Sequence, residues 1–481
     1  MIRLKYSRNL VSLVLSSIVL LLLVSCNNTS ETDNVNDTNN AIDPIIEQIV
    51  NLDMEALEGE VLTIAISGNK LVLLEFTQRY MIQNPGITIE IICYEWLFRR
   101  DGNLSAAQQE IGVQLMAGTG PVLIDSDLVD YLNPASQQLL FDWFPLMQAS
   151  PDFNEDDWFM NVFHATSING RLYKFPVGFD YVRISYNSLI PGLSEIMSGR
   201  EGITFSELFD IYDNFTYDKT HNFMYFFSLV NLRWVLPCFI DNFIDLENGI
   251  VDFNDEFIEF ITYANNIASF AGLVDWSHPE INFITLNMDA YLSERYFFRS
   301  FRSIHYNMLL DVNDVFSFKG YIPIVDTSGE VFINTTGGGG NSWLLNANAT
   351  SEQLAIAWDF IQFRNDPSNF PGSWDSHFIP TNRDMLMHQL KTRLYGPGGA
   401  IRWLNPDVTL AEALGTSDIV FEKITEISER PLRNFNRLPD SVNTVLWDAV
   451  SQFTYGLVSA EQTAQNLQNQ IELMIMEMGL D

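Results

Sequence analysis

The chain has 481 residues, of which 47% are hydrophobic, and its formal net charge is −35. This length suits one large or two medium domains. The negative charge argues against nucleic acid or an anionic membrane surface as a partner, because phosphate groups would repel the protein. A neutral or cationic ligand is compatible with it.

The N-terminus has the pattern of an export signal. Three basic residues among the first eight precede an apolar run over residues 10–24. That run is too short for a spanning helix, and a basic start before a short apolar core is typical of a signal peptide. The sequence Leu-Val-Ser-Cys at 23–26 resembles the lipobox of bacterial lipoproteins. We therefore expect a signal peptide over 1–25 and lipidation of Cys26; the alternative is an uncleaved anchor.

The segment after Cys26 is polar. Nearly every residue from 27 to 40 is Asn, Thr, Ser, Asp or Glu, and such a segment cannot bury enough apolar surface to order itself. We expect a disordered tether over 26–58. Of the two remaining cysteines, Cys93 lies in an apolar run and is predicted to pack as a small buried hydrophobe. A disulfide between it and Cys238 is the alternative.

Strand and helix patterns alternate in the next part of the chain. Apolar runs of strand length alternate with stretches of helical periodicity, which predicts an α/β fold with a largely parallel sheet. The expected strands are 61–66, 87–93 and 122–124, and the expected helices are 71–83 and 105–118.

Polar residues follow the first and third of these strands. Asn69 and Lys70 come after the first strand, and Asp125 and Ser126 come after the third. Ligands of such sheets bind outside the carboxyl ends of the strands, so these four residues are candidates for a binding edge.

The second half of the chain adds weaker signals. Residues 181–318 are aromatic and mainly helical, and short strands are expected at 320–324 and 343–345, on either side of four glycines at 337–340. Capping-box spacing starts a helix after Thr350. Ser459 precedes a long final helix whose apolar stripe predicts core packing.

Common enzyme signatures are absent from the sequence. It has no G-x-S-x-G elbow, no H-E-x-x-H, no phosphate loop and no dinucleotide fingerprint, and its six histidines do not pair at metal-ligand spacing. We expect no catalytic residue, no metal and no cofactor. Glycoside hydrolases have no universal carboxylate signature, so an anchored hydrolase stays open as an alternative.

One longer segment resembles a known family. Residues 163–180, Phe-His-Ala-Thr-Ser-Ile-Asn-Gly-Arg-Leu-Tyr-Lys-Phe-Pro-Val-Gly-Phe-Asp, followed by Ser-Tyr-Asn at 185–187, resemble a motif of the family 1 extracellular solute-binding proteins. These are the maltose- and oligosaccharide-binding proteins of ABC importers. The glycine run, Trp-Asp-Phe-Ile at 358–361 and the segment 456–462 occur in the family's order.

This resemblance implies a two-lobed periplasmic-binding-protein (Venus-flytrap) fold of type II, with hinge crossovers between the lobes. The first crossover would lie at 175–180. The implied lobes are 59–177 with 319–370, and 178–318 with 371–481.

The resemblance also implies site residues. Asp180 stands where the family places an acid that binds sugar hydroxyls, and Asn69 and Lys70 stand where it has a polar residue and a lysine. Ser126 replaces a common aromatic residue, so stacking on a sugar would fall to other side chains. We expect Trp343 and Trp374 to stack, and the backbone at Gly339 to approach the ligand.

Each of these residues has a plainer interpretation. Either tryptophan could be core packing, Asp180 a hinge carboxylate, Lys70 a surface residue, and the glycine run a flexible turn.

The predicted function is capture of a carbohydrate, an oligosaccharide by preference, by a monomer on the extracellular face of the cell membrane. The protein would touch the membrane through its lipid anchor only and deliver the sugar to ABC transporter permease subunits. Besides a hydrolase, the alternative is a sensory binding protein that feeds a membrane kinase.

Overall fold

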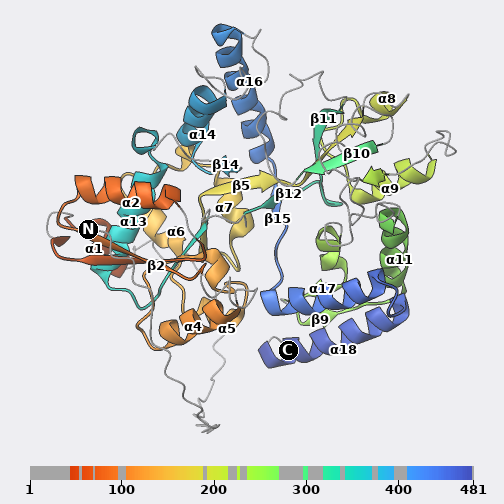
Figure 1. Cartoon of the computed structure of the whole chain (residues 1–481), viewed down its shortest axis with the longest axis horizontal. Coiled ribbons are helices and arrows are strands. Elements are labelled where there is room, and N and C mark those ends of the chain that lie inside the picture. The colour runs from red at the N-terminus through yellow and green to blue at the C-terminus, as the bar shows by residue number, and fades with distance from the viewer. Residues whose placement is uncertain are drawn as a thin grey trace, which may run out of the picture.

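The structure is a computed structural model arranged in two lobes (Figure 1). It describes residues 44–53, 57–68, 71–95, 105–187, 192–214, 225–227, 236–246, 248–269, 296–301, 318–335, 342–370, 378–394 and 409–478. The expected signal peptide and Cys26 lie outside these ranges. In the described part of the chain, no helix has the length and apolarity needed to cross a membrane.

The first lobe is built on one five-stranded sheet. Its order is β2 (Thr88–Cys93), β1 (Val61–Ile66), β3 (Leu123–Asp125), β13 (Ser342–Leu345) and β4 (Lys174–Pro176). β1 is parallel to β2 and β3, while β13 is antiparallel to both β3 and β4. The largely parallel sheet expected from the sequence is therefore confirmed. Only β13 runs the other way, since it enters this sheet from the second lobe.

Helices cover both faces of this sheet (Figure 1). Its upper face in that view carries α1 (Pro44–Val50), α2 (Leu71–Gln83), α6 (Trp143–Ala149) and α13 (Ser351–Asn365). The opposite face carries α4 (Ser105–Met116), with the short α5 (Pro134–Gln137) beside it. The expected capping box of Thr350 is confirmed at the start of α13.

A four-stranded sheet joins the two lobes, and we call it the hinge sheet. Its order is β14 (Ile379–Pro380), β5 (Gly178–Tyr181), β12 (Val331–Asn334) and β15 (Leu432–Asn434). Only Val177 separates β4 of the first lobe from β5, β12 is followed by β13 of the first lobe, and β14 follows α13 along the chain. Figure 1 shows this sheet at the centre of the molecule.

Helices α7 (Met160–Thr166), α14 (Arg383–Gln389) and α16 (Leu410–Ser428) pack on the hinge sheet. The hydroxyl of Tyr181 on β5 lies 2.9 Å from the carbonyl oxygen of Ile424 and 2.6 Å from the hydroxyl of Ser428, both on α16.

The second lobe contains another four-stranded sheet and a group of long helices. The sheet order is β11 (Phe318–Pro323), β6 (Arg183–Asn187), β10 (Tyr296–Phe301) and β7 (Tyr225–Phe227), and a hairpin joins β8 (Ile244–Asp245) to β9 (Ile250–Val251). The helices are α8 (Leu193–Met197), α9 (Phe205–Asn214), α11 (Asp255–Ser269), α17 (Asp440–Thr454) and α18 (Ala460–Met478).

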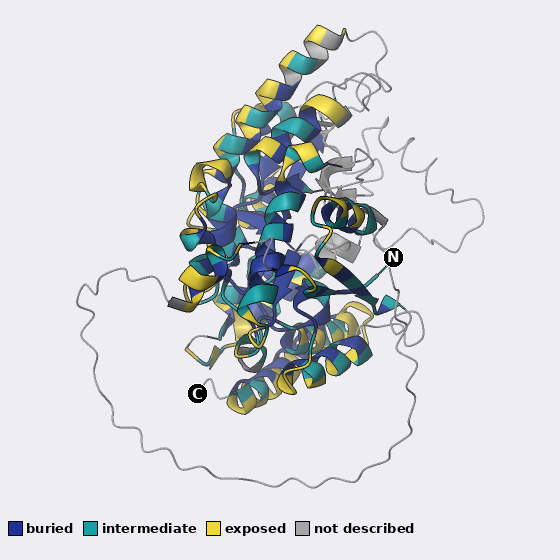
Figure 2. Cartoon of the chain, turned by 90° about the vertical axis from the view of Figure 1, so that its left-hand side faces the viewer, coloured by how far each residue is buried: buried dark blue, intermediate teal, exposed yellow. Residues whose placement is uncertain are grey.

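The predicted stripe of the final helix α18 packs as expected. Leu467 and Ile471 are fully buried against α11 and α17. The outer faces of the long helices are exposed (Figure 2).

One lobe boundary expected from the sequence does not match the strand pairing. Residues 319–341 were assigned to the first lobe, but β11 pairs with β6 and β12 pairs with β5. Ile322, Ile324 and Phe332 lie in a core of the second lobe. The chain therefore re-enters the first lobe only at β13.

Gly178, at the start of β5, permits close packing in the hinge sheet. A Cβ atom there would lie 3.0 Å from the Cβ of Phe378 and 3.1 Å from the carbonyl oxygen of Ile379. Overpacking of this kind costs about 1–3 kcal/mol. We predict that Gly178→Ala lowers the free energy of unfolding by that amount in denaturant titrations.

Gly112 provides the matched control. It lies within α4, and a Cβ there would meet nothing within 4 Å. Since alanine is the better helix former by about 1 kcal/mol, Gly112→Ala should stabilise the protein. Equal effects of the two substitutions would contradict the hinge packing.

Candidate functional site between the two lobes

The ends of β1 and β3 come together at the predicted binding edge. Asp125 ends β3, and one of its carboxylate oxygens accepts hydrogen bonds from the Ser67 amide (3.0 Å) and the Ser67 hydroxyl (2.6 Å). Asp125 is almost fully buried. It therefore ties the two strand ends together, and the partly buried Ser126 follows it at the start of a short 3-10 turn. Asn69 and Lys70 lie outside the described residues.

Asp180 lies on β5 within the hinge sheet. Its carboxylate accepts a hydrogen bond from the guanidinium of Arg183 at 3.2 Å, and both side chains are at most 2% exposed. Asn334 of β12 is directly opposite in the sheet. Removing one partner of such a pair would leave the other as an uncompensated buried charge. This position fits the interpretation of Asp180 as a hinge carboxylate.

The stacking role predicted for Trp343 does not fit its position. Its side chain is fully buried in the core of the first lobe, on the face of β13 covered by α13. The guanidinium of Arg364 lies 5.4 Å from the ring centroid, and no face of the ring is open to a ligand. The prediction for Trp343 is therefore wrong: alternation along β13 directs this residue inward. Trp374 and Gly339 lie outside the described residues.

Polar residues of the two lobes meet at what we call the interlobe seam. The first lobe contributes Gln108, Asp127, Asp130, Tyr131 and Lys174, the hinge sheet contributes Asn434, and the second lobe contributes Asp440.

The clearest contact across the seam is at the start of α17. The backbone amide of Asp440, the first residue of α17, donates to the carboxylate of Asp130 at 2.9 Å. The residue before it is Pro439, which makes no side-chain cap bond. From α4, the amide of Gln108 donates to the Asp440 carboxylate at 3.1 Å. Because free amides and a partial positive charge lie at a helix N-terminus, the first lobe in effect caps a helix of the second.

Lys174, the first residue of β4, is the most unusual member of the seam. It is fully buried, and its ammonium nitrogen lies 4.6 Å from the centroid of the Tyr131 ring. Among the residues that the structure describes, none accepts a hydrogen bond from it. Burial lowers the pKa of Lys174 to about 7, although the charges of Asp127 and Asp440 act in the opposite direction.

Sequence reasoning singled out neither Lys174 nor Tyr131. The available signal was a lysine inside the otherwise apolar run Tyr173–Val177.

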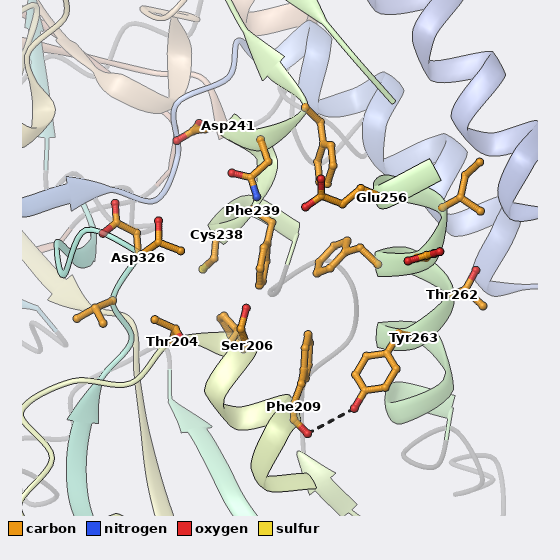
Figure 3. A pocket seen from close by; sticks show the side chains of 18 of the residues that line it. Thr204, Ser206, Phe209, Cys238, Phe239, Asp241, Glu256, Thr262, Tyr263 and Asp326 are labelled. Carbon is orange, nitrogen blue, oxygen red and sulfur yellow. Dashed lines mark hydrogen bonds between the residues drawn. The ribbon is translucent and has the colours of Figure 1, made fainter. Parts of the chain in front are cut away.

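A separate pocket lies within the second lobe (Figure 3). Its volume is about 900 Å³, and aromatic side chains of α9 and α11 line it together with residues 238–243. The hydroxyl of Tyr263 donates to the Phe209 carbonyl across one wall. The described lining residues come from the second lobe and, with Arg433 of β15, from the hinge sheet, and none comes from the first lobe. The pocket therefore does not lie between the two lobes. The interlobe seam is the site that a two-lobed fold would open and close.

Comparisons with known proteins bear on the fold. No protein-family model matches the sequence, and neither does any curated protein. The structure resembles the sugar-binding protein MalE from Xanthomonas citri with a TM-score of 0.56 at 14% identity, covering 87% of this chain and 98% of that one.

Two further solved structures show the same likeness. A family 1 extracellular solute-binding protein from Alicyclobacillus acidocaldarius has a TM-score of 0.50 at 12% identity, over 86% of this chain and 98% of its own. An ABC transporter solute-binding protein from Agrobacterium radiobacter, in complex with ribitol, has a TM-score of 0.51 at 14% identity, over 87% and 99%. The chain has the periplasmic-binding-protein fold.

The charges at the seam predict how contact between the lobes depends on pH. Burial, helped by the charge of Asp440, raises the pKa of Asp130 from 3.8 to about 7, and burial lowers that of Lys174 from 10.5 to about 7. At a pH between 3.8 and about 7, the Asp130 carboxyl is ionised when the seam is open and protonated when it is closed. Closing the seam then takes up a proton, so a falling pH favours the closed form. At a pH between about 7 and 10.5, Lys174 is protonated when the seam is open and neutral when it is closed. Closing the seam then releases a proton, so a rising pH favours the closed form. Without solute, the closed seam should be weakest near neutral pH.

Small-angle scattering of the solute-free protein at about pH 5, 7 and 9 would measure this. The radius of gyration should be largest at the middle pH. Asp130→Asn should abolish the change on the acid side only, and Lys174→Met the change on the alkaline side only. A profile that neither substitution alters would contradict the assignment.

Proposed function

We propose that this protein is a lipid-anchored extracellular solute-binding protein that captures a carbohydrate between its lobes and delivers it to an ABC transporter permease. The observation that carries the proposal is the polar seam between two lobes joined by a three-segment hinge. Sugars need paired donors and acceptors for their hydroxyls and flat aromatic surfaces for their C–H faces. Gln108, Asn434 and Tyr131 offer such groups at the seam.

The likeness to solved sugar-binding proteins supports the same proposal. An oligosaccharide is the preferred solute, since the sequence motif at 163–187 resembles that of maltose- and oligosaccharide-binding proteins. The anchor would be Cys26, whose lipid would hold the protein at the outer face of the membrane.

Calorimetry against a panel of glycans tests the binding function. The soluble form beginning at residue 27 should bind at least one oligosaccharide, and its radius of gyration should fall on binding as the lobes close. A protein that binds a peptide or a polyamine but no glycan would refute the carbohydrate assignment. Turnover of a labelled oligosaccharide, lost in Asp180→Asn, would instead establish a hydrolase.

The anchor has its own test in bacterial cells that export the full chain. Cys26→Ser should abolish incorporation of a labelled fatty acid and release the protein from the membrane fraction. Cys93→Ser is the matched control, because Cys93 lies at the end of β2 in the folded body and should leave labelling unchanged. Labelling that survives Cys26→Ser would disprove the anchor.

A further inference from the structure

The ammonium group of Lys174 is a buried charge without a hydrogen-bond acceptor. It carries three donors, and the residues that the structure describes provide no acceptor for any of them. The ammonium nitrogen lies over the face of Tyr131, 4.6 Å from the ring centroid. A buried, unpaired charge destabilises a protein strongly, so a position that retains one is a candidate for binding a ligand.

Lys174 lies where residues of both lobes could contact a ligand. Phe175, the next residue of β4, faces the opposite side of the sheet and packs in the core. Lys174 faces the side on which α4 and Tyr131 lie, at the first position of β4, the strand that leads into the hinge. Asp440 of the second lobe is near enough to influence its charge yet accepts no hydrogen bond from it.

We propose that Lys174 is a solute-binding residue, whose ammonium donates hydrogen bonds to oxygen atoms of a sugar held against the Tyr131 ring as the lobes close. This inference rests on the proposed function and adds to it the residue and the class of solute. In the present structure the seam is closed over Lys174, so a solute reaches it when the lobes part.

The surrounding charges select the class of sugar. Asp127 and Asp440 place two carboxylates near the ammonium group, and Asp130 lies beside Asp440, from whose amide it accepts a hydrogen bond. A solute with a carboxylate or phosphate would be repelled by them, whereas neutral hydroxyls can accept from Lys174 and donate to the carboxylates. The solute is therefore a neutral sugar, and its uronic-acid counterpart should bind more weakly.

Lys174→Met provides the first test, with Arg171→Met as the matched control. Arg171 is an exposed cation three residues away. Lys174→Met should raise the Kd for the best glycan of the panel about ten-fold, and the melting temperature of the solute-free protein should stay the same or rise, since an unpaired buried charge is removed. Arg171→Met should change neither. A fall in melting temperature that accompanies the loss of affinity would mean a structural role and overturn the proposal.

Deoxy derivatives of the same glycan test the contact itself. For the wild-type protein, one deoxy derivative should bind about ten-fold more weakly than the parent. Lys174→Met should bind that derivative and the parent equally, since the partner of the missing hydroxyl is gone. Lys174→Gln, which keeps a donor without the charge, should lie between the two.

The outcomes of these experiments distinguish the role proposed for Lys174 from the proposed carbohydrate-binding function. If no glycan binds the wild-type protein, both fail. If glycans bind and no deoxy derivative distinguishes wild type from Lys174→Met, the carbohydrate function stands and Lys174 is not a binding residue. Tighter binding of the uronic-acid counterpart would overturn the neutral-sugar assignment.

Discussion

The convergence of three chain crossings in one short sheet is the constraint on which the rest of the structure depends. The Thr381 amide and hydroxyl, from the third crossing, donate to the carbonyl oxygens of Val177 and Pro176 in the first. The Ser342 hydroxyl donates to Thr335 where the second crossing enters β13. Crossings tied together in this way form one connection between the lobes, about which the proposed opening and closing would take place. Within the hinge the buried pair of Asp180 and Arg183 is matched in charge.

Several polar side chains of the hinge and one of the interlobe seam differ in how they are paired. In the hinge, Tyr181, Thr381 and Asp180 all have partners within the protein. At the seam, Lys174 has no acceptor among the residues that the structure describes, and Asp130 lies close to the carboxylate of Asp440. The ammonium nitrogen of Lys174 would make the stability of the closed seam depend on whether an enclosed solute offers it an acceptor. A solute that supplies hydrogen bonds can then shift the balance between two arrangements of the lobes.

Local patterns predicted local structure well. The strands and helices between Val61 and Asp125 follow their periodicity closely, because each pattern is set by near neighbours. The assignment of 319–341 to the first lobe was wrong because the pattern of a strand does not show which strand it pairs with. The partner of β11 is β6, which lies more than a hundred residues earlier in the chain. Trp343 was misread because a buried aromatic and a stacking aromatic look alike in sequence. Lys174 was missed because its meaning depends on Tyr131 and on the second lobe.

The first turn of α17 has one further consequence. Pro439 makes no side-chain cap bond, and the first free amide of the helix is satisfied by Asp130 of the other lobe. In the proposed opening of the lobes, that amide would exchange the carboxylate of Asp130 for water. The Asp440 amide is thus a natural reporter of the motion, whose magnetic resonance signal would follow opening in real time without any attached label.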